Sequence, residues 1–179
     1  MEKAYTIQIA GLERKLSLCA VNDQIDIAAF ILFGDVELTV AAAEALLHKA
    51  PPFDIILTPE AKSIPLAYEM ARQSGKPYAV ARKSTKLYMK DPIFVEVRSI
   101  TTDRVQTLYL GQDEIRLLAG KRVLIVDDVI STGESLLAVE KLVDRAGATI
   151  AGACAILAEG DAANRSDIFF LQPLPLFFK

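Results

Sequence analysis

Two adjacent acids, Asp127 and Asp128, follow an apolar run and precede a turn rich in hydroxyl groups. The segment is VLIVDDVISTGES, residues 123–135, and its apolar residues predict a buried β-strand. Ligands of open α/β sheets bind at the carboxyl edge of the strands, and this pattern places both carboxylates there. Carboxylate oxygens in that position can accept hydrogen bonds from the hydroxyls of a sugar.

The turn that follows the acids has the composition of an anion-binding site. It consists of Ser131, Thr132, Gly133, Glu134 and Ser135, and we expect it to open a helix. A helix N-terminus offers unpaired backbone N–H groups and a favourable dipole to an anion, and a glycine permits close approach. The alternative is that Ser131 or Thr132 only caps the helix and that the acids are solvated. The whole arrangement favours a ligand site, because adjacent acids at a buried strand end cost free energy without partners.

Strands and helices alternate along most of the chain. Apolar runs at 53–57, 77–81, 122–126 and 148–157 predict strands, and helices are expected at 35–48, at 64–72 and from the turn to about 145. This order predicts an α/β fold with a mostly parallel sheet flanked by helices. The stretch 82–120 is less regular, with IFVEVRSI and QTLYL as strands on either side of the polar TTDR.

The first 33 residues do not fit the alternation. Residues 5–20 alternate polar and apolar types around Gly11, which predicts a β-hairpin. We therefore predict a small N-terminal cap, or hood, over 1–33, on a core over 34–179 that acts as a single functional domain.

Composition excludes several classes of protein. With 52% hydrophobic and 24% charged residues, the 179-residue chain suits a globular core rather than disorder. A net charge of −3 argues against a nucleic-acid binder. Cys19 and Cys154 lie in apolar runs and are predicted to be small buried residues, neither a disulfide nor a zinc site, which favours a reducing, cytoplasmic compartment. We see no signal peptide and no membrane-spanning run.

The strand, acid pair and T-G turn resemble the signature of the type I phosphoribosyltransferases, and the chain as a whole is similar to their adenine and xanthine members. The resemblance implies the fold of that family and a purine phosphoribosyltransferase that uses 5-phosphoribosyl 1-diphosphate (PRPP). It implies that Asp127 and Asp128 act at the ribose and that residues 131–135 bind the 5′-phosphate. Mg²⁺ would be held mainly by PRPP, with the same two acids as further candidate ligands. Glu134 and Ser135 depart from the glycine and threonine of many relatives.

Two more segments carry the resemblance, and it implies that both bind the diphosphate. The first is the loop Glu60, Ala61, Lys62 and Ser63, and the second is the basic cluster Arg82, Lys83 and Lys86. In some relatives the second segment reaches the neighbouring subunit's site, which implies a homodimer. The alternatives are a solvated loop lysine and an ordinary basic surface turn. Residues 101–112 resemble the family's flexible loop, which closes over the reacting centre and excludes water.

The residues that recognise the purine base are expected in the cap and near the end of the strand AILAE. Ile25 and Phe30 are predicted to line the base pocket, with packing of the cap as the alternative for each. Glu159 stands near the place where oxopurine enzymes tend to keep a lysine, and a carboxylate accepts from an amine, which favours adenine. The alternative for Glu159 is simple exposure to solvent. Xanthine, hypoxanthine or guanine remain other bases, and a PRPP-sensing, RNA-binding regulator of the same fold is the alternative from another class.

Overall fold

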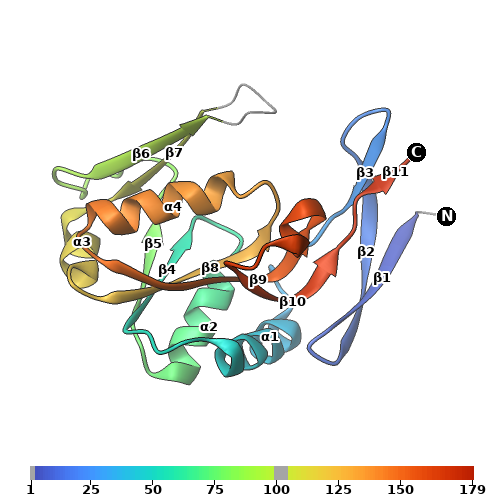
Figure 1. Cartoon of the computed structure of the whole chain (residues 1–179), viewed down its shortest axis with the longest axis horizontal. Coiled ribbons are helices and arrows are strands. Elements are labelled where there is room, and N and C mark those ends of the chain that lie inside the picture. Colours follow the sequence, from blue (N-terminus) through green and yellow to red (C-terminus); the bar gives the residue numbers. More distant parts are fainter. Residues whose placement is uncertain (1–2, 99–104) are drawn as a thin grey trace.

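The computed structural model describes residues 3–98 and 105–179, and its centre is a five-stranded sheet in the order β10-β9-β8-β4-β5 (Figure 1). The strands are β4 (Ile55–Pro59), β5 (Tyr78–Ala81), β8 (Arg122–Ile130), β9 (Thr149–Glu159) and β10 (Phe169–Leu174). Each neighbouring pair in this sheet is parallel. The predicted α/β architecture is thus confirmed, and β8, which carries the acid pair, runs through the middle of the sheet.

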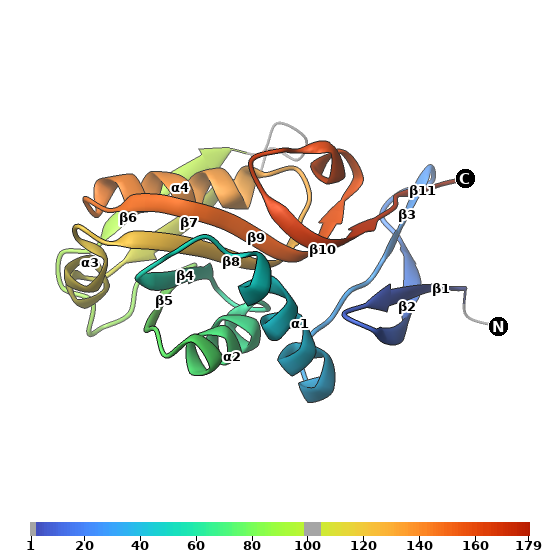
Figure 2. The same cartoon turned by 60° about the horizontal axis from the view of Figure 1, so that its bottom comes forward.

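Helices cover both faces of the sheet (Figures 1 and 2). α1 (Val36–Lys49) and α2 (Ile64–Ser74) pack on one face, and α4 (Glu134–Arg145) packs on the other. Val123 and Ile125 of β8 belong to the core on the α4 side, whereas Leu124 and Val126 belong to the core on the α1 side. Successive side chains of a strand point to opposite faces, so a strand covered on both sides reads as one continuous apolar run. None of the described helices is long and apolar enough to cross a membrane.

The predicted helix boundaries hold closely. The Asp35 carboxylate accepts a hydrogen bond from the backbone N–H of Leu38 at 3.1 Å and so caps α1. Gly75, with a φ of 68°, ends α2 in the left-handed conformation that favours glycine. The short helices α3 (Gln112–Leu118) and η1 (Gly160–Asn164) were not predicted. Segments this short do not contain enough residues for a helical periodicity to be recognised.

The irregular stretch forms a hairpin of two antiparallel strands, β6 (Ile93–Arg98) and β7 (Val105–Leu110), which packs against α4. Both strands were predicted. The expected flexible loop over 101–112 falls partly on residues 101–104, which lie outside the described residues. Its remainder, 105–112, forms β7 and the start of α3.

A second, antiparallel sheet contains most of the N-terminal residues and lies to one side of the core (Figure 1). Its strands are β1 (Ala4–Ile9), β2 (Leu12–Ala20), β3 (Ile25–Ala28) and β11 (Phe177–Phe178). The Gly11 hairpin is confirmed, but β11 comes from the far end of the sequence and was not expected. Cys19 is exposed, so its predicted burial is wrong, whereas that of Cys154 is confirmed. Along β2 the buried side is that of Leu16, and Cys19 falls on the opposite one.

An ion pair ties this sheet to the core. Arg14 of β2 donates through Nε to Asp35 Oδ2 at 2.6 Å and through Nη2 to Asp35 Oδ1 at 3.0 Å, and Nη2 also bonds Glu37 at 2.9 Å. Asp35 therefore both caps α1 and anchors the hairpin. The hydrogen bonds from Arg14 are the main reason that the pKa of Asp35 lies below its ordinary value.

Replacing Asp35 by alanine should lower the free energy of unfolding by about 1–2 kcal/mol, the usual value of a lost helix cap. A lowered folded pKa stabilises the protein above the ordinary Asp value of 3.8, and this contribution is lost as the pH falls through the folded value. The gap between wild type and variant in urea unfolding should therefore narrow in acid. Asp23→Ala, at an exposed turn residue, is the control and should change little. Equal stability of Asp35→Ala and wild type at neutral pH would contradict the dual role of Asp35.

Candidate active site

The carboxyl ends of β4 and β8 meet at a cavity of about 390 Å³. Its lining comprises Pro59, Glu60, Ala61, Lys62, Ser63, Lys83, Gln106, Asp127, Asp128, Val129 and Ser135. A smaller hollow of about 40 Å³ shares Asp127, Val129 and Ser135 with it and is otherwise lined by residues 130–133 and Leu136. The structure thus brings the acid pair, the 60–63 loop and the 131–135 turn to one place.

The two acids differ in their surroundings. Asp128 is buried, and its Oδ2 lies 3.0 Å from Lys62 Nζ but accepts no hydrogen bond from the residues that the structure describes. Asp127 is partly exposed at the cavity, and its Oδ1 accepts from the backbone N–H of Asp128 at 2.9 Å. Burial first, and the charge of Asp128 second, raise the pKa of Asp127. Such a pair is stabilised by a cation or by hydroxyl donors in the cavity.

Buried hydroxyl groups fix the loop between β4 and α2. Thr58 donates to Ser63 Oγ at 2.8 Å, and Ser63 donates to the Pro59 carbonyl at 3.0 Å. The peptide bond between Glu60 and Ala61 is cis. This network leaves Ala61 and Lys62 exposed at the edge of the cavity, with the lysine directed to Asp128.

Of the predicted basic cluster, Lys83 lines the cavity, whereas Arg82 and Lys86 do not. Glu60 Oε2 accepts from the backbone N–H of Lys83 at 2.9 Å and lies 3.4 Å from Arg82 Nε. The Arg82 backbone also pairs with Tyr109 of β7, and Lys86 donates to Ser84 at 3.0 Å. In this arrangement the Glu60 carboxylate positions the basic turn.

The hydroxyl-rich turn begins α4 at Gly133, which has a φ of 82°. Among the described groups no side chain caps this helix by a hydrogen bond, so the simple cap expected as an alternative for Ser131 or Thr132 is not found. Ser131 and Thr132 are exposed, and Ser135 donates to Gln106 of β7 at 3.0 Å. The backbone N–H groups at the N-terminus of a helix are the groups that bind anions in such turns.

The predicted base residues lie away from the cavity lining. Phe30 is buried in the core between the cap and α1, and Ile25 pairs with Phe178 in the cap sheet. Glu159 is half-buried at the end of β9. The pKa of its carboxyl group is raised, because the effect of burial exceeds the opposite effect of the nearby Lys62. A contact of any of the three with a base stays a prediction.

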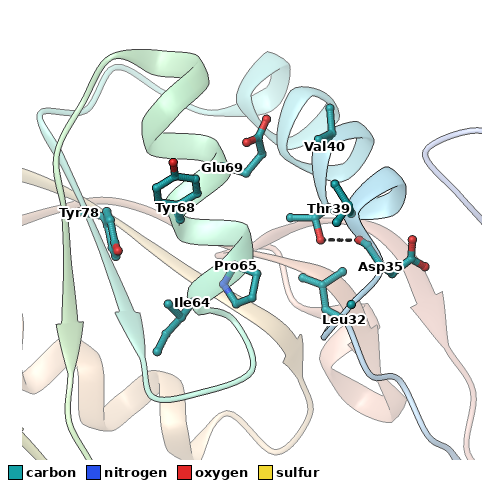
Figure 3. Close-up of a pocket in the computed structure, with 11 residues that line it drawn as sticks. Leu32, Asp35, Thr39, Val40, Ile64, Pro65, Tyr68, Glu69 and Tyr78 are labelled. Atoms are coloured by element: carbon teal, nitrogen blue, oxygen red, sulfur yellow. Dashed lines mark hydrogen bonds between the residues drawn. The ribbon is translucent and has the colours of Figure 1, made fainter.

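A separate hollow of about 500 Å³ lies over α1 and α2, as Figure 3 shows. Its walls are mostly apolar, with Leu32, Val36 and Tyr68 among them. The carboxylates at its rim, Asp35 and Glu69, are already paired with arginines. It offers binding surface rather than reactive groups.

The cavity fits a metal ion only in part. Among the described residues there is no group of three or more His, Cys, Asp or Glu side chains that could hold one. Asp127 and Asp128 can supply carboxylate oxygens, the donors that Mg²⁺ prefers. Among the residues that the structure describes, none donates a hydrogen bond to Asp128 Oδ2. An ion there would take its remaining ligands from a substrate and from water.

Comparison with known families agrees with this geometry. The profile of the family described as phosphoribosyl transferase domain matches residues 37–172, well over half of the chain. The chain belongs to this family. The phosphoribosyltransferase match covers most of the central sheet and the helices on both of its faces. It starts after the first three strands of the cap.

Relatives within the phosphoribosyltransferase family differ in base. The chain is 37% identical over 112 residues to a hypoxanthine/guanine phosphoribosyltransferase of Methanococcus voltae, covering 63% of this chain and 56% of the relative. It is 31% identical over 147 residues to the adenine phosphoribosyltransferase of Mycobacterium tuberculosis, covering 81% and 65%. A crystal structure of the adenine phosphoribosyltransferase from Thermoanaerobacter pseudethanolicus matches with a TM-score of 0.67 and 25% identity over 79% of this chain and 84% of that one. The chain thus spans less than two thirds of the length of both curated relatives.

Three features of the site were not predicted from the sequence. They are the contact between Lys62 and Asp128, the Thr58–Ser63 hydrogen bond, and the place of Gln106 in the cavity. The spacing between Thr58 and Ser63 at the end of an apolar strand was a usable signal for the second. The other two join distant segments and had none.

Asp127→Asn should make the ligand-free protein more stable at about pH 8 by about 1–2 kcal/mol, since one pKa unit corresponds to about 1.4 kcal/mol. A raised folded pKa means that the folded state favours the protonated acid, so wild-type stability falls as the pH rises above 3.8 towards the raised value. The variant lacks this penalty, and its advantage should vanish near pH 4. Urea unfolding at both pH values measures it, with Asp23→Asn as an exposed control. A less stable Asp127→Asn at pH 8 would show that the free acid pair is not under strain.

Proposed function

We propose that this chain is a purine phosphoribosyltransferase that favours adenine, transferring ribose 5-phosphate from PRPP to the base and releasing diphosphate, as in purine salvage. One observation carries the proposal: the acid pair, the 60–63 loop and the 131–135 turn line two adjoining hollows at the carboxyl edge of a parallel sheet. Membership of the phosphoribosyl transferase domain family supports it.

The parts of PRPP match the parts of the cavity by charge. The 5′-phosphate takes the N–H groups and hydroxyls of the turn 131–135, beside the smaller hollow. The ribose hydroxyls donate to Asp127 and Asp128. The diphosphate takes the backbone of 60–63 with Lys62 and Lys83, the lysines that line the larger hollow. Arg82 and Lys86 contribute positive charge from the same basic turn.

The reaction breaks the bond between ribose C1 and the diphosphate oxygen and forms one between C1 and a purine nitrogen. The electron pair of the broken bond leaves with diphosphate, and the proton of the attacking nitrogen passes to water. Positive charge develops on the sugar in the transition state, and in our proposal the buried carboxylate of Asp128 stabilises it. Lys62 lies within reach of both the Asp128 carboxylate and the cavity, where it favours the departing diphosphate.

Mg²⁺ is the cofactor that this donor set supports. It would be held mainly by PRPP, with Asp127 and Asp128 as the protein oxygens nearest to it. When bound, it neutralises negative charge on the diphosphate.

Adenine is favoured by Glu159 and by the adenine phosphoribosyltransferases among the relatives. The Glu159 carboxylate can accept from the amine of adenine but would repel the carbonyl of an oxopurine. The hypoxanthine/guanine relative, at 37% identity, makes an oxopurine the second candidate.

The active form is proposed to be a homodimer in the cytoplasm. Leu87 and Tyr88 directly follow the basic turn, and these neighbouring side chains are 108% and 70% exposed. Further exposed apolar residues, Val36 and Tyr68, lie at the hollow of Figure 3. A second copy of the chain would cover such surfaces and bring its own basic turn close to the site. Free cysteines, one of them exposed, suit a reducing compartment.

Diphosphate release from PRPP and Mg²⁺ should be seen with adenine and be at least tenfold slower with hypoxanthine, guanine and xanthine.

Asp128→Asn should lower kcat about a hundredfold, as expected for a lost electrostatic group at the transition state.

Glu159→Gln should lower kcat/KM for adenine while leaving the KM for PRPP unchanged.

The outcomes of this panel separate the candidates. Turnover with an oxopurine alone keeps the reaction but contradicts the adenine assignment. Tight PRPP binding without turnover on any base contradicts the enzyme and favours a regulator that senses PRPP. Chelation of Mg²⁺ should abolish turnover, and full activity without a divalent ion would contradict the cofactor.

Leu87→Asp should convert a dimer to a monomer in sedimentation experiments, because a charge at the centre of an apolar contact is left unpaired. Leu137→Asp, at an exposed apolar residue of α4, should leave the dimer intact. A wild-type monomer at micromolar concentration, or a dimer unaffected by Leu87→Asp, would contradict this interface.

A further inference from the structure

Arg165 lies against the turn that opens α4, although residues 136–164 separate the two along the chain. A Cβ atom on Gly133 would come within 2.5 Å of Arg165 Nη1 and 3.7 Å of its Cζ. The guanidinium therefore occupies the space that a side chain at 133 would need. The φ of 82° favours glycine at this position, and the missing side chain leaves room for the guanidinium.

Asp167 fixes the orientation of this guanidinium. Nε of Arg165 donates to Asp167 Oδ1 at 2.9 Å, and Nη2 donates to Oδ2 at 2.6 Å. This fork uses two of the three nitrogens and leaves Nη1, the one nearest Gly133. Hydrogen bonding to Asp167 also raises the pKa of Arg165, so its charge is present at every working pH.

The charges around the turn make a cation there consequential. Glu134 lies in the first turn of α4, and Glu140 of the same helix is close enough to Arg165 and Asp167 for both to affect its pKa. The Glu140 carboxylate opposes an anion on the turn, and the positive charge of Arg165 acts against that effect.

We propose that Arg165 is a binding residue for the anion on the 131–135 turn, which in the proposed function is the 5′-phosphate of PRPP. The inference rests on that function, since it assumes a phosphate on this turn. It adds to the N–H groups and hydroxyls a guanidinium delivered by the segment after β9.

Ribose 5-phosphate and inorganic diphosphate, titrated separately by calorimetry, test the proposal. Arg165→Gln should weaken ribose 5-phosphate about tenfold, as for loss of a charge-assisted contact, and leave diphosphate unchanged. Arg165→Lys keeps the charge and should recover most of the affinity. Raising the salt concentration should reduce the difference between wild type and Arg165→Gln.

Arg122→Gln is the matched control. Arg122 makes the same fork, Nε at 3.0 Å and Nη2 at 2.8 Å, to Asp54, and both stand at the start of the parallel strands, away from the carboxyl edge. This variant removes an equal charge and should bind ribose 5-phosphate like wild type.

The possible results are distinct. Failure of the wild-type protein to bind ribose 5-phosphate contradicts the proposed function and this inference with it. Normal binding by Arg165→Gln, or equal weakening of both ligands, overturns the inference alone. If Arg165→Gln does not fold, the double variant Arg165→Gln, Asp167→Asn removes the unpaired carboxylate as well and carries the same expectation.

Discussion

The side-by-side carboxylates of Asp127 and Asp128 at the carboxyl edge of β8 are the constraint on which the site depends. Two acids at a buried strand end repel each other and lose hydration, which destabilises the empty site. The contact from Lys62 to Asp128 offsets part of this cost. The part of this cost that Lys62 does not offset favours the binding of ligands that bring hydroxyl groups or a cation. A site that is unfavourable when empty gains more from the right ligand, a common trade between stability and function.

The rest of the site is arranged around that strand end by the parallel sheet. Parallel strands deliver their carboxyl ends to the same edge, so the loop after β4 and the turn after β8 become neighbours without being close in sequence. Buried hydroxyl groups hold the loop after β4 in place. The turn after β8 is held by α4 and by the hydrogen bond to Gln106. In the proposed function these two segments take the phosphates of the ligand, and the acid pair takes the sugar between them.

The cap is attached to this core by a shared apolar cluster, in which Ile9 and Leu16 are buried together with Leu46 of α1, and by specific polar contacts. Arg14 and Asp35 join β2 to the start of α1, and β11 returns from the core to pair with β3. Lys179 strengthens that return through an ion pair with Asp26 at 2.8 Å and a hydrogen bond to the Asn22 carbonyl.

The sequence by itself determined most of the strand and helix order, the bounds of the three main helices, and the acid pair with its turn. These depend on periodicity and on local backbone preferences, which a few neighbouring residues express. Only the tertiary structure decided which segments meet: Lys62 with Asp128, Arg165 with Gly133, and β11 with the cap. It also decided that Cys19 is exposed and that Lys83, but not Arg82 or Lys86, lines the cavity. Such contacts join residues far apart along the chain, and the packing of the sheet and its helices, rather than any local pattern, sets their distances.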